Sequence, residues 1–282
     1  MTESSTRPGR SADVTTVTID EGVFRQQVDR VAVEEPLEIR LLAGKERRSL
    51  VLTMRTPGHD FELAAGFLFN EGIVRSREEI VGISYCLDAE IDQTQQYNIV
   101  NVELRARSLP DLSAYTRLFS GYGACGICGR ESIEALEARG LDNIDDSTTV
   151  APALLYGLPD RMRAAQPIFE RTGGLHATAL FNAAGELLVL REDIGRHNAF
   201  DKVVGEAFLA DRLPLKGRIA LVSGRASFEL VQKAVAAQIP ILASISAPSS
   251  LAVDLSRRFG ITLVGFLRGH RANVYAAEER VR

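Results

Sequence analysis

The stretch Arg218-Ile219-Ala220-Leu221-Val222 begins the segment whose pattern decides the fold of the last third of the chain. Two further short apolar runs follow it, Pro240-Ile241-Leu242-Ala243-Ser244 and Ile261-Thr262-Leu263-Val264-Gly265-Phe266. Two amphipathic segments, 227–237 and 249–259, lie between the runs. Short apolar runs that alternate with helical segments indicate parallel strands joined by helices. We therefore expect a βαβαβ unit with right-handed crossovers.

The carboxyl ends of these three strands should meet at one edge, where open parallel sheets place their ligand sites. The residues expected there are rich in hydroxyls and arginines, and they are Ser223-Gly224-Arg225, 246–250 and Phe266-Leu267-Arg268-Gly269-His270-Arg271. Arginine forks and helix N-termini both bind phosphate, so the edge suits a nucleotide-bearing ligand. These edge segments contain neither a Walker loop nor a GxGxxG motif, which argues against the phosphate binding of ATPases and dehydrogenases there. For Ser223 and Ser249, helix capping is an equally good explanation.

A second polar cluster lies upstream of this unit. After a helix over 160–171, residues 176–181 and 185–191 predict a hairpin. The chain leaves it through Arg191-Glu192-Asp193-Ile194-Gly195-Arg196-His197-Asn198, just before a helix over 199–209. Such a cluster at a helix N-terminus can bind an anion or position a proton-transfer group, or it can be a salt-bridged cap. The sequence favours neither.

Two of the three cysteines, Cys125 and Cys128, lie in the segment 120–129 together with four glycines. Such a glycine-rich segment predicts reachable thiols on a mobile loop rather than packed, buried ones. A zinc site would need a second ligand pair, which the chain does not offer. A thioredoxin-like dithiol would need a preceding strand, although a helix over 131–140 would favour the thiolate. A carrier thiol is the interpretation that we favour.

Composition narrows the class of protein. The chain has 282 residues, of which 45% are hydrophobic, enough for one large core or two modest ones. Its net charge of -4 gives no electrostatic footprint for nucleic acid. An odd cysteine count and the lack of a signal-like apolar segment in residues 1–12 favour a cytoplasmic location. Residues 234–253 are uncharged, but Pro240 and Pro248 interrupt them, so we expect no membrane helix.

The first half of the chain predicts a smaller, mixed part. Strands are expected over 37–41 and 49–54 as a hairpin, followed by a helix that begins near Asp60 and ends at Gly72. Another strand is expected over 97–104, and Cys86 is expected to be a buried strand cysteine. The predicted organisation is a disordered tail and lead-in over 1–30, an N-terminal α+β part over 31–140 that carries the cysteine loop, a linker over 141–155, and a C-terminal α/β cofactor-binding domain over 156–282.

Several blocks of the sequence resemble one known family. The segment Gly123-Ala124-Cys125-Gly126-Ile127-Cys128-Gly129 is similar to the cysteine loop of the formate dehydrogenase accessory sulfurtransferases, the FdhD family. The other similar blocks, in the same order as in the family, are 54–60, 62–68, 172–176, 193–199, 223–225 and 266–271. Together the blocks extend from Val31 to Tyr275, so the resemblance covers most of the chain.

The resemblance implies a cytidine deaminase-like α/β fold, a three-layer sandwich. Zinc deaminases place a glutamate two residues after a metal ligand, and a Pro-Cys-x-x-Cys pair downstream. Here His176 is followed at that distance by Thr178, and the cysteine pair lies upstream without a proline. Deaminase chemistry is therefore not expected even if the scaffold is shared.

The resemblance also implies a function. Cys125 would accept a persulfide from a cysteine desulfurase, and Cys128 would help release the sulfur or hold it. The acceptor would be Mo-bis(molybdopterin guanine dinucleotide), bound as a client cofactor by Phe266–Arg271 before it enters formate dehydrogenase. The family acts as a homodimer, and no metal site of its own is expected. The alternative is a non-catalytic molybdenum-cofactor chaperone with a redox-sensing dithiol.

Overall fold

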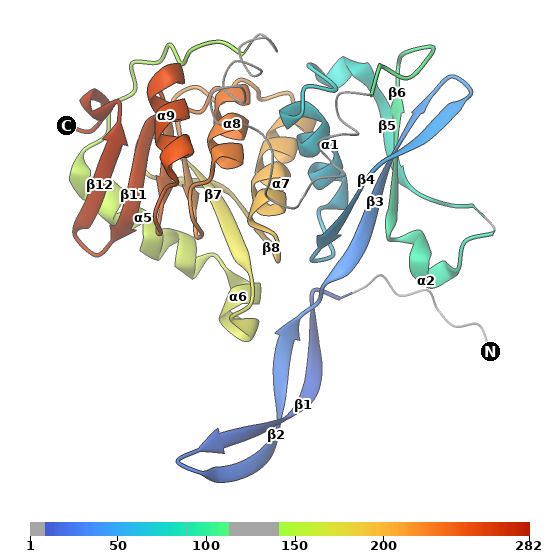
Figure 1. Ribbon diagram of the computed structural model, residues 1–282, viewed down its shortest axis with the longest axis horizontal. Helices are drawn as coiled ribbons and strands as arrows, with labels where there is room; N and C mark the ends of the chain where they lie inside the picture. Colours follow the sequence, from blue (N-terminus) through green and yellow to red (C-terminus); the bar gives the residue numbers. More distant parts are fainter. Residues whose placement is uncertain (1–8, 89, 113–140) are drawn as a thin grey trace.

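A six-stranded mixed sheet forms the centre of the C-terminal part (Figure 1). The computed structural model describes residues 9–88, 90–112 and 141–282. The strands of this sheet are β7 (His176–Asn182), β8 (Leu187–Asp193), β9 (Arg218–Val222), β10 (Ile241–Ser244), β11 (Thr262–Arg268) and β12 (Arg271–Ala276). Their order in the sheet is β12-β11-β10-β9-β7-β8. Strands β9, β10 and β11 are parallel, which confirms the βαβαβ unit, and β7 with β8 confirms the predicted hairpin.

Helices cover both faces of this sheet, in the three layers that the fold class predicts. They are α5 (Pro152–Ala164), α6 (Pro167–Thr172), α7 (Arg196–Leu209), α8 (Phe228–Ala236) and α9 (Ser250–Phe259). Side chains alternate along a strand, so Ile219 packs in the core with α5, whereas Ala220 packs in the core with α7, α8 and α9. The helix expected over 160–171 is two helices, because α6 starts afresh at Pro167.

The N-terminal part is a four-stranded sheet of order β4-β3-β6-β5 (Figure 1). Its elements are β3 (Glu35–Ala43), β4 (Glu46–Arg55), α1 (Asp60–Asn70), a 3-10 turn (Arg77–Glu79), β5 (Ile80–Tyr85), α2 (Gln93–Gln96) and β6 (Ile99–Leu104). Apolar residues of β3 and α1 form one buried cluster, which confirms the predicted hairpin and helix. Cys86 is buried as expected, one residue beyond the end of β5 rather than within a strand.

Helices α1 and α7 join the two parts of the molecule, and they touch at two glycines. A Cβ atom on Gly66 would lie 1.9 Å from the backbone oxygen of Asp201. A Cβ atom on Gly205 would lie 1.8 Å from the backbone oxygen of Glu62. Only glycine permits this approach, so the two residues set the distance between the helices.

Residues 11–32 form a hairpin that extends away from both sheets (Figure 1). Strands β1 (Ser11–Asp20) and β2 (Val23–Ala32) pair along their whole length. Glu21 and Gly22 between them both have positive φ, as a two-residue type I′ turn requires. The disordered lead-in expected over residues 1–30 is therefore corrected for residues 11–30, and residues 1–8 lie outside the described part.

The expected linker, 141–155, runs over the C-terminal part without helix or strand until α5 begins at Pro152. Ile144 is buried there, and its N–H donates to the carbonyl of Phe259 at 2.8 Å. A membrane-spanning helix needs about 20 mostly apolar residues, and the described residues contain none. The predicted cysteine loop and the helix over 131–140 lie outside the described residues.

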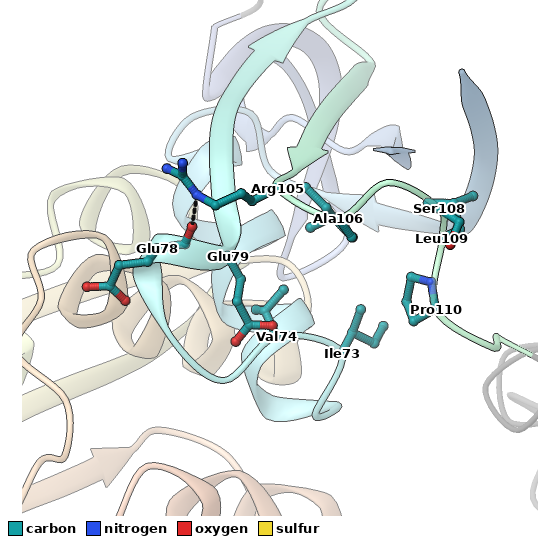
Figure 2. A pocket seen from close by; sticks show the side chains of 10 residues that line it. Ile73, Val74, Glu78, Glu79, Arg105, Ala106, Ser108, Leu109 and Pro110 are labelled. Carbon is teal, nitrogen blue, oxygen red and sulfur yellow. Dashed lines mark hydrogen bonds between the residues drawn. The ribbon is translucent and has the colours of Figure 1, made fainter. Parts of the chain in front are cut away.

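A pocket of 380 Å³ opens in the N-terminal part, between the segment that follows α1 and the segment that follows β6 (Figure 2). Ile73 and Val74, which follow α1, line one side, and Leu109 and Pro110, which follow β6, line the other. None of these residues belongs to the blocks that suggested a site in the sequence. The pocket is a feature of the N-terminal part, separate from the edge of the C-terminal sheet.

Candidate functional site

The carboxyl ends of the three parallel strands meet at one edge of the sheet, as predicted, and two further strands also reach this edge. The parallel strands β9, β10 and β11 bring their carboxyl ends to one edge. Strand β7 is antiparallel to β9, so its first residue, His176, lies at this edge as well. Strand β8 ends here at Asp193, directly opposite His176. The two polar clusters that the sequence showed separately therefore lie along the same edge of the sheet, which we call the rim.

Hydrogen bonds connect neighbouring strand ends along the rim. The Ser223 Oγ accepts from the backbone N–H of Ala177 at 2.9 Å. The Ser244 Oγ donates to the carbonyl of Gly224 at 2.6 Å, and the Phe266 N–H donates to the carbonyl of Ser246 at 3.0 Å. Serine side chains here hold the backbone in place. The contact of Ser223 with Ala177 favours a structural role for this serine, but it does not cap a helix, since the N-cap of α8 is Ser227.

The start of α9 shows that capping role directly. Ser249 is its N-cap, and its Oγ accepts from the backbone N–H of Ala252 at 3.2 Å. This is the helix capping that the sequence allowed for Ser249.

Because Gly224 has no side chain, the imidazole ring of His176 can pack close to the backbone at the rim. A Cβ atom at Gly224 would lie 3.2 Å from His176 Nδ1, so the ring packs against bare backbone. Burial lowers the pKa of His176, and the positive charge of Arg196 lowers it further. His176 is therefore neutral at pH 7, where its ring can accept a proton.

The cluster over 191–198 divides into a structural half and a half that faces the rim. Asp193 is fully buried, with its Oδ2 2.6 Å from Lys202 Nζ. His197 faces the rim instead, with its Nε2 2.7 Å from Glu229 Oε2 and 3.2 Å from Ser227 Oγ. The hydrogen bond from His197 lowers the pKa of Glu229. The buried Asp193–Lys202 pair fits the structural alternative, and a role of His197 in anion binding or proton transfer stays a prediction.

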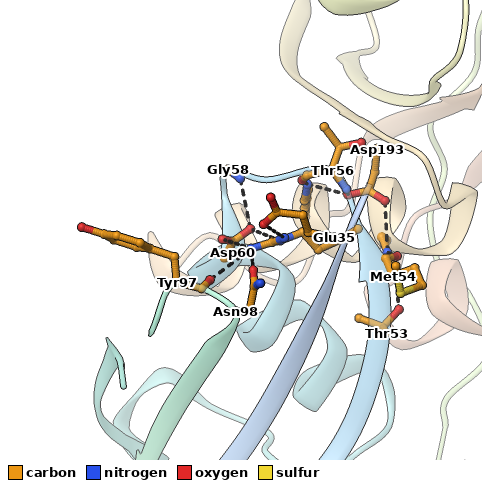
Figure 3. A network of polar contacts seen from close by, with 12 residues as sticks. Glu35, Thr53, Met54, Thr56, Gly58, Asp60, Tyr97, Asn98 and Asp193 are labelled. Carbon is orange, nitrogen blue, oxygen red and sulfur yellow. Dashed lines mark hydrogen bonds and ion pairs between the residues drawn. The ribbon is translucent and has the colours of Figure 1, made fainter. Parts of the chain in front are cut away.

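A network of buried polar contacts fixes the rim to the N-terminal part (Figure 3). Asp193 accepts from the backbone N–H of Thr56 at 3.2 Å, and Lys202 Nζ donates to the Thr56 carbonyl at 2.9 Å. Arg55, also fully buried, pairs with Asp60 at 3.3 Å. The sequence did not predict the contacts of Thr56 with Asp193 and Lys202, because these partners come from distant parts of the chain.

The block Phe266–Arg271 forms the end of β11, a tight turn and the start of β12. Arg268 and Arg271 lie directly opposite each other in the β11–β12 register, and both are exposed. Phe266, which has a φ of 53°, borders a shallow pocket of 120 Å³ together with Arg268, Arg271 and Asn273. Two guanidinium groups in direct register repel each other unless an anion lies between them. The pair is thus a candidate phosphate site.

The remaining members of the predicted cofactor segment are buried or exposed in different ways. Leu267 is buried in the core beside α5, so its role is packing. Gly269 and His270 form the exposed turn, and the His270 ring meets Tyr156 of α5 edge to face at 5.8 Å. Arg225 is exposed beside Gly224, two strands away from the arginine pair in the sheet order.

The structure does not describe residues 113–140, which contain the predicted catalytic residues Cys125 and Cys128. Cys86 is buried, with its Sγ 3.7 Å from an Arg47 nitrogen. Over 9–88, 90–112 and 141–282, no group of three or more His, Cys, Asp or Glu side chains is placed to hold a metal ion.

Comparison with known proteins gives consistent results. The sequence model of the FdhD/NarQ family matches residues 32–282. A Streptomyces avermitilis protein named sulfur carrier protein FdhD is 51% identical over 268 residues, which are 94% of this chain and 93% of that protein. A Mycobacterium tuberculosis protein of the same name is 49% identical over 257 residues, covering 90% and 92%. The crystal structure of a candidate formate dehydrogenase accessory protein from Desulfotalea psychrophila superposes with a TM-score of 0.74 at 28% identity, covering 97% and 100%.

Proposed function

This chain belongs to the FdhD/NarQ family, and on that premise we propose that it is a sulfurtransferase with a cysteine persulfide intermediate. It carries sulfur from a cysteine desulfurase to the bis-guanine-dinucleotide molybdenum cofactor, which a formate dehydrogenase requires. The names of its relatives, sulfur carrier protein and formate dehydrogenase accessory protein, support the carrier role and the client enzyme. The Cys125 and Cys128 pair supplies the thiols that such a carrier needs.

The observation that carries the cofactor half of the proposal is the register pair Arg268 and Arg271. A phosphate group between the two guanidinium groups would replace their repulsion with two charge-assisted hydrogen-bonded contacts. The shallow pocket beside the pair, bordered by Phe266, offers an aromatic ring to a guanine base. The residues therefore fit the phosphate and guanine ends of the proposed client cofactor, which is cargo rather than a resident group.

The sulfur step is a displacement of the thiol–disulfide type. The Cys125 thiolate attacks the outer sulfur of the donor's persulfide, and the donor's own thiolate leaves. Cys125 then carries that sulfur as a persulfide, with no net oxidation or reduction. Cys128 either displaces hydrosulfide by attacking the Cys125 sulfur, which leaves a disulfide, or holds the loaded sulfur by a hydrogen bond. The protein acts in the cytoplasm as a homodimer.

The test is restoration of formate dehydrogenase activity in a bacterium that lacks its own copy of this protein. Wild type should restore the activity and Cys125→Ala should not. A Cys125→Ala protein that restores full activity would contradict the carrier role and would favour the alternative, a molybdenum-cofactor chaperone with a redox-sensing dithiol.

Nucleotide binding is measured separately, with guanosine diphosphate as the probe in titration calorimetry. Arg268→Ala should weaken binding about tenfold or more, because a charge-assisted contact is worth about 1.5–3 kcal/mol. The matched control is Arg257→Ala, an exposed arginine in the last turn of α9, away from the carboxyl edge. Equal weakening in both variants would contradict a specific role of the register pair.

A further inference from the structure

The first turn of α7 carries a guanidinium group whose hydrogen bonds are incomplete. Arg196 is the first residue of this helix, and it lies at the rim beside Gly224 and His176. Its Nε is buried and has no hydrogen-bond partner among the described residues. A buried donor without a partner is costly, because it has left water without gaining an acceptor. An acceptor that a ligand brings to the rim would remove this cost.

Two helix N-termini lie next to each other at this place, and no side chain caps either of them. The N-cap of α7 is Gly195, which has no side chain, and the N-cap of α8 is Ser227, whose side chain accepts no cap hydrogen bond. The Ser227 Oγ instead lies 3.2 Å from His197 Nε2, so the first turn of α7 contacts the start of α8. The first N–H groups of a helix lack acceptors within the helix and carry partial positive charge, which favours an anion.

A second buried polar atom without a partner lies close to the same place. Thr178 is 1% exposed, and its Oγ1 has no hydrogen-bond partner in the described parts of the chain. Thr178 lies opposite Val222 in the β7–β9 register, and Val222 belongs to the core on the α7 side of the sheet. Thr178 therefore faces α7, on the same face of β7 as His176 and two residues further into the strand. Its hydroxyl can donate to a ligand atom that enters beside His176.

The charges around this place favour an anion. The carboxylates of Asp193 and Glu229 each have a basic side chain as partner, at 2.6 Å and 2.7 Å. Burial, and then the positive charge of Arg196, lowers the pKa of His176, so the guanidinium lies near a neutral imidazole. Arg196 is therefore the basic group that no carboxylate matches here. An oxyanion such as phosphate suits this set, because it accepts several charge-assisted hydrogen bonds at once.

We infer that Arg196, His176 and Thr178, together with the N-termini of α7 and α8, form a subsite that binds one oxyanion of the phosphate class. The subsite lies between β7 and β9, whereas the register pair Arg268 and Arg271 lies between β11 and β12. Three strand spacings of about 4.8 Å separate the two places, so they are about 14 Å apart along the rim. One phosphate group cannot contact both. The inference rests on the cofactor half of the proposed function, and the oxyanion is either an anionic part of the client cofactor or free phosphate.

The test is the binding of inorganic phosphate to the full chain, followed by nitrogen NMR of the His176 imidazole, whose signals are those that His176→Gln lacks. Phosphate should shift these signals to saturation and raise the pKa of His176, because a bound anion stabilises the imidazolium. Arg196→Gln should weaken binding about tenfold or more, since it removes a charge-assisted contact. The matched control Arg257→Gln, in the last turn of α9, should leave binding within about twofold of wild type. Signals that phosphate does not move, or equal weakening in both variants, would overturn the inference.

A second variant keeps the test valid if Arg196→Gln does not fold. Thr178→Val preserves the shape of the side chain and removes the hydroxyl that has no partner. It should raise the melting temperature slightly and weaken phosphate binding about threefold or more. Saturation with guanosine diphosphate should leave phosphate binding beside His176 in place, because the two sites are separate. Unchanged phosphate binding in Thr178→Val, or competition by guanosine diphosphate, would contradict the subsite as described.

Formate dehydrogenase maturation decides which oxyanion the subsite holds. If it holds a part of the client cofactor, Arg196→Gln should restore about a tenth of the activity or less, while Cys125 still accepts sulfur from a desulfurase. Full restoration by a variant with weakened phosphate binding would assign the subsite to free phosphate. Absent sulfur loading in wild type would be a failure of the carrier role alone, since the phosphate measurement does not involve the thiols.

Discussion

Glu62 of α1 links the two parts of the molecule through Arg191 of β8. The Glu62 Oε2 lies 2.6 Å from Arg191 Nε, and Oε1 lies 2.9 Å from Arg191 Nη2. Burial alone would raise the pKa of Glu62, but hydrogen bonds from Arg191 and His59 outweigh it and lower the pKa to about 2. Since the ordinary value is 4.5, the ionised carboxylate stabilises the fold above that pH. This stabilisation is lost as the pH falls from 4.5 toward 2.

Glu62→Gln should therefore flatten the acid side of the stability profile. The free energy of unfolding of wild type should fall in this pH window by at most about 3 kcal/mol more than that of the variant. Urea unfolding at a series of pH values measures the difference. The exposed Glu278→Gln serves as control, and a Glu62→Gln profile that parallels wild type would show that the pair with Arg191 is not what depresses this pKa.

Lys202 and Asp193 form the second buried link, with side chains 1% and 0% exposed. Burial lowers the pKa of Lys202, and the attraction of Asp193 opposes that shift. Lys202→Met would leave Asp193 buried without its cation, so the free energy of unfolding should fall by about 3–5 kcal/mol. The double variant Lys202→Met with Asp193→Asn should be less destabilised than the single variant. Chemical denaturation checks this, and additive effects of the two substitutions would contradict the pairing.

Among contacts between helices and strands, the one between α1 and α7 gives the most specific prediction. Alanine is normally favoured over glycine within a helix by about 1 kcal/mol. At Gly66 the new Cβ would collide with the α7 backbone at 1.9 Å, so Gly66→Ala should lower the melting temperature. The control is Gly157→Ala in α5, where nothing lies within 4 Å and the temperature should rise slightly. A rise in both variants would contradict the close packing of the two helices.

The helices and strands also show which parts of the fold could be predicted from the sequence. The βαβαβ unit was predictable because buried parallel strands are short apolar runs that helical segments separate. The β1–β2 hairpin was missed, because its strands are mostly polar and the turn Glu21-Gly22 is not among the common type I′ pairs. The usable signal was the alternation Thr15, Val17, Ile19, which has the two-residue period of a strand.

The same limit applies to the candidate site. The segment with Arg268 and Arg271 was found because a parallel sheet gathers its strand ends at one edge. Pairs such as Asp193 with Thr56 could not be predicted, since local patterns do not specify contacts between residues 137 positions apart. The approach of His176 to Gly224 depends likewise on the antiparallel addition of β7 to the sheet.

For the whole molecule, the proposed function requires two parts of the chain to act together. The carboxyl edge of the C-terminal sheet would hold the client cofactor, and the segment with Cys125 and Cys128 would carry the sulfur. Helices α1 and α7, with the Glu62–Arg191 and Lys202–Asp193 pairs beside them, connect the N-terminal part to this edge. The cysteine segment leaves the N-terminal part after residue 112 and enters the C-terminal part at residue 141, so it connects the two.

The carrier role of Cys125 is tested most directly by the intact mass of the protein after incubation with an active cysteine desulfurase and free cysteine. Wild type should gain the mass of one sulfur atom, which a thiol reductant removes, and Cys128→Ala tests whether the second thiol is needed. Cys125→Ala should gain nothing. A wild type that gains no sulfur from a desulfurase of proven activity, or a Cys125→Ala protein that gains it equally, would contradict the account.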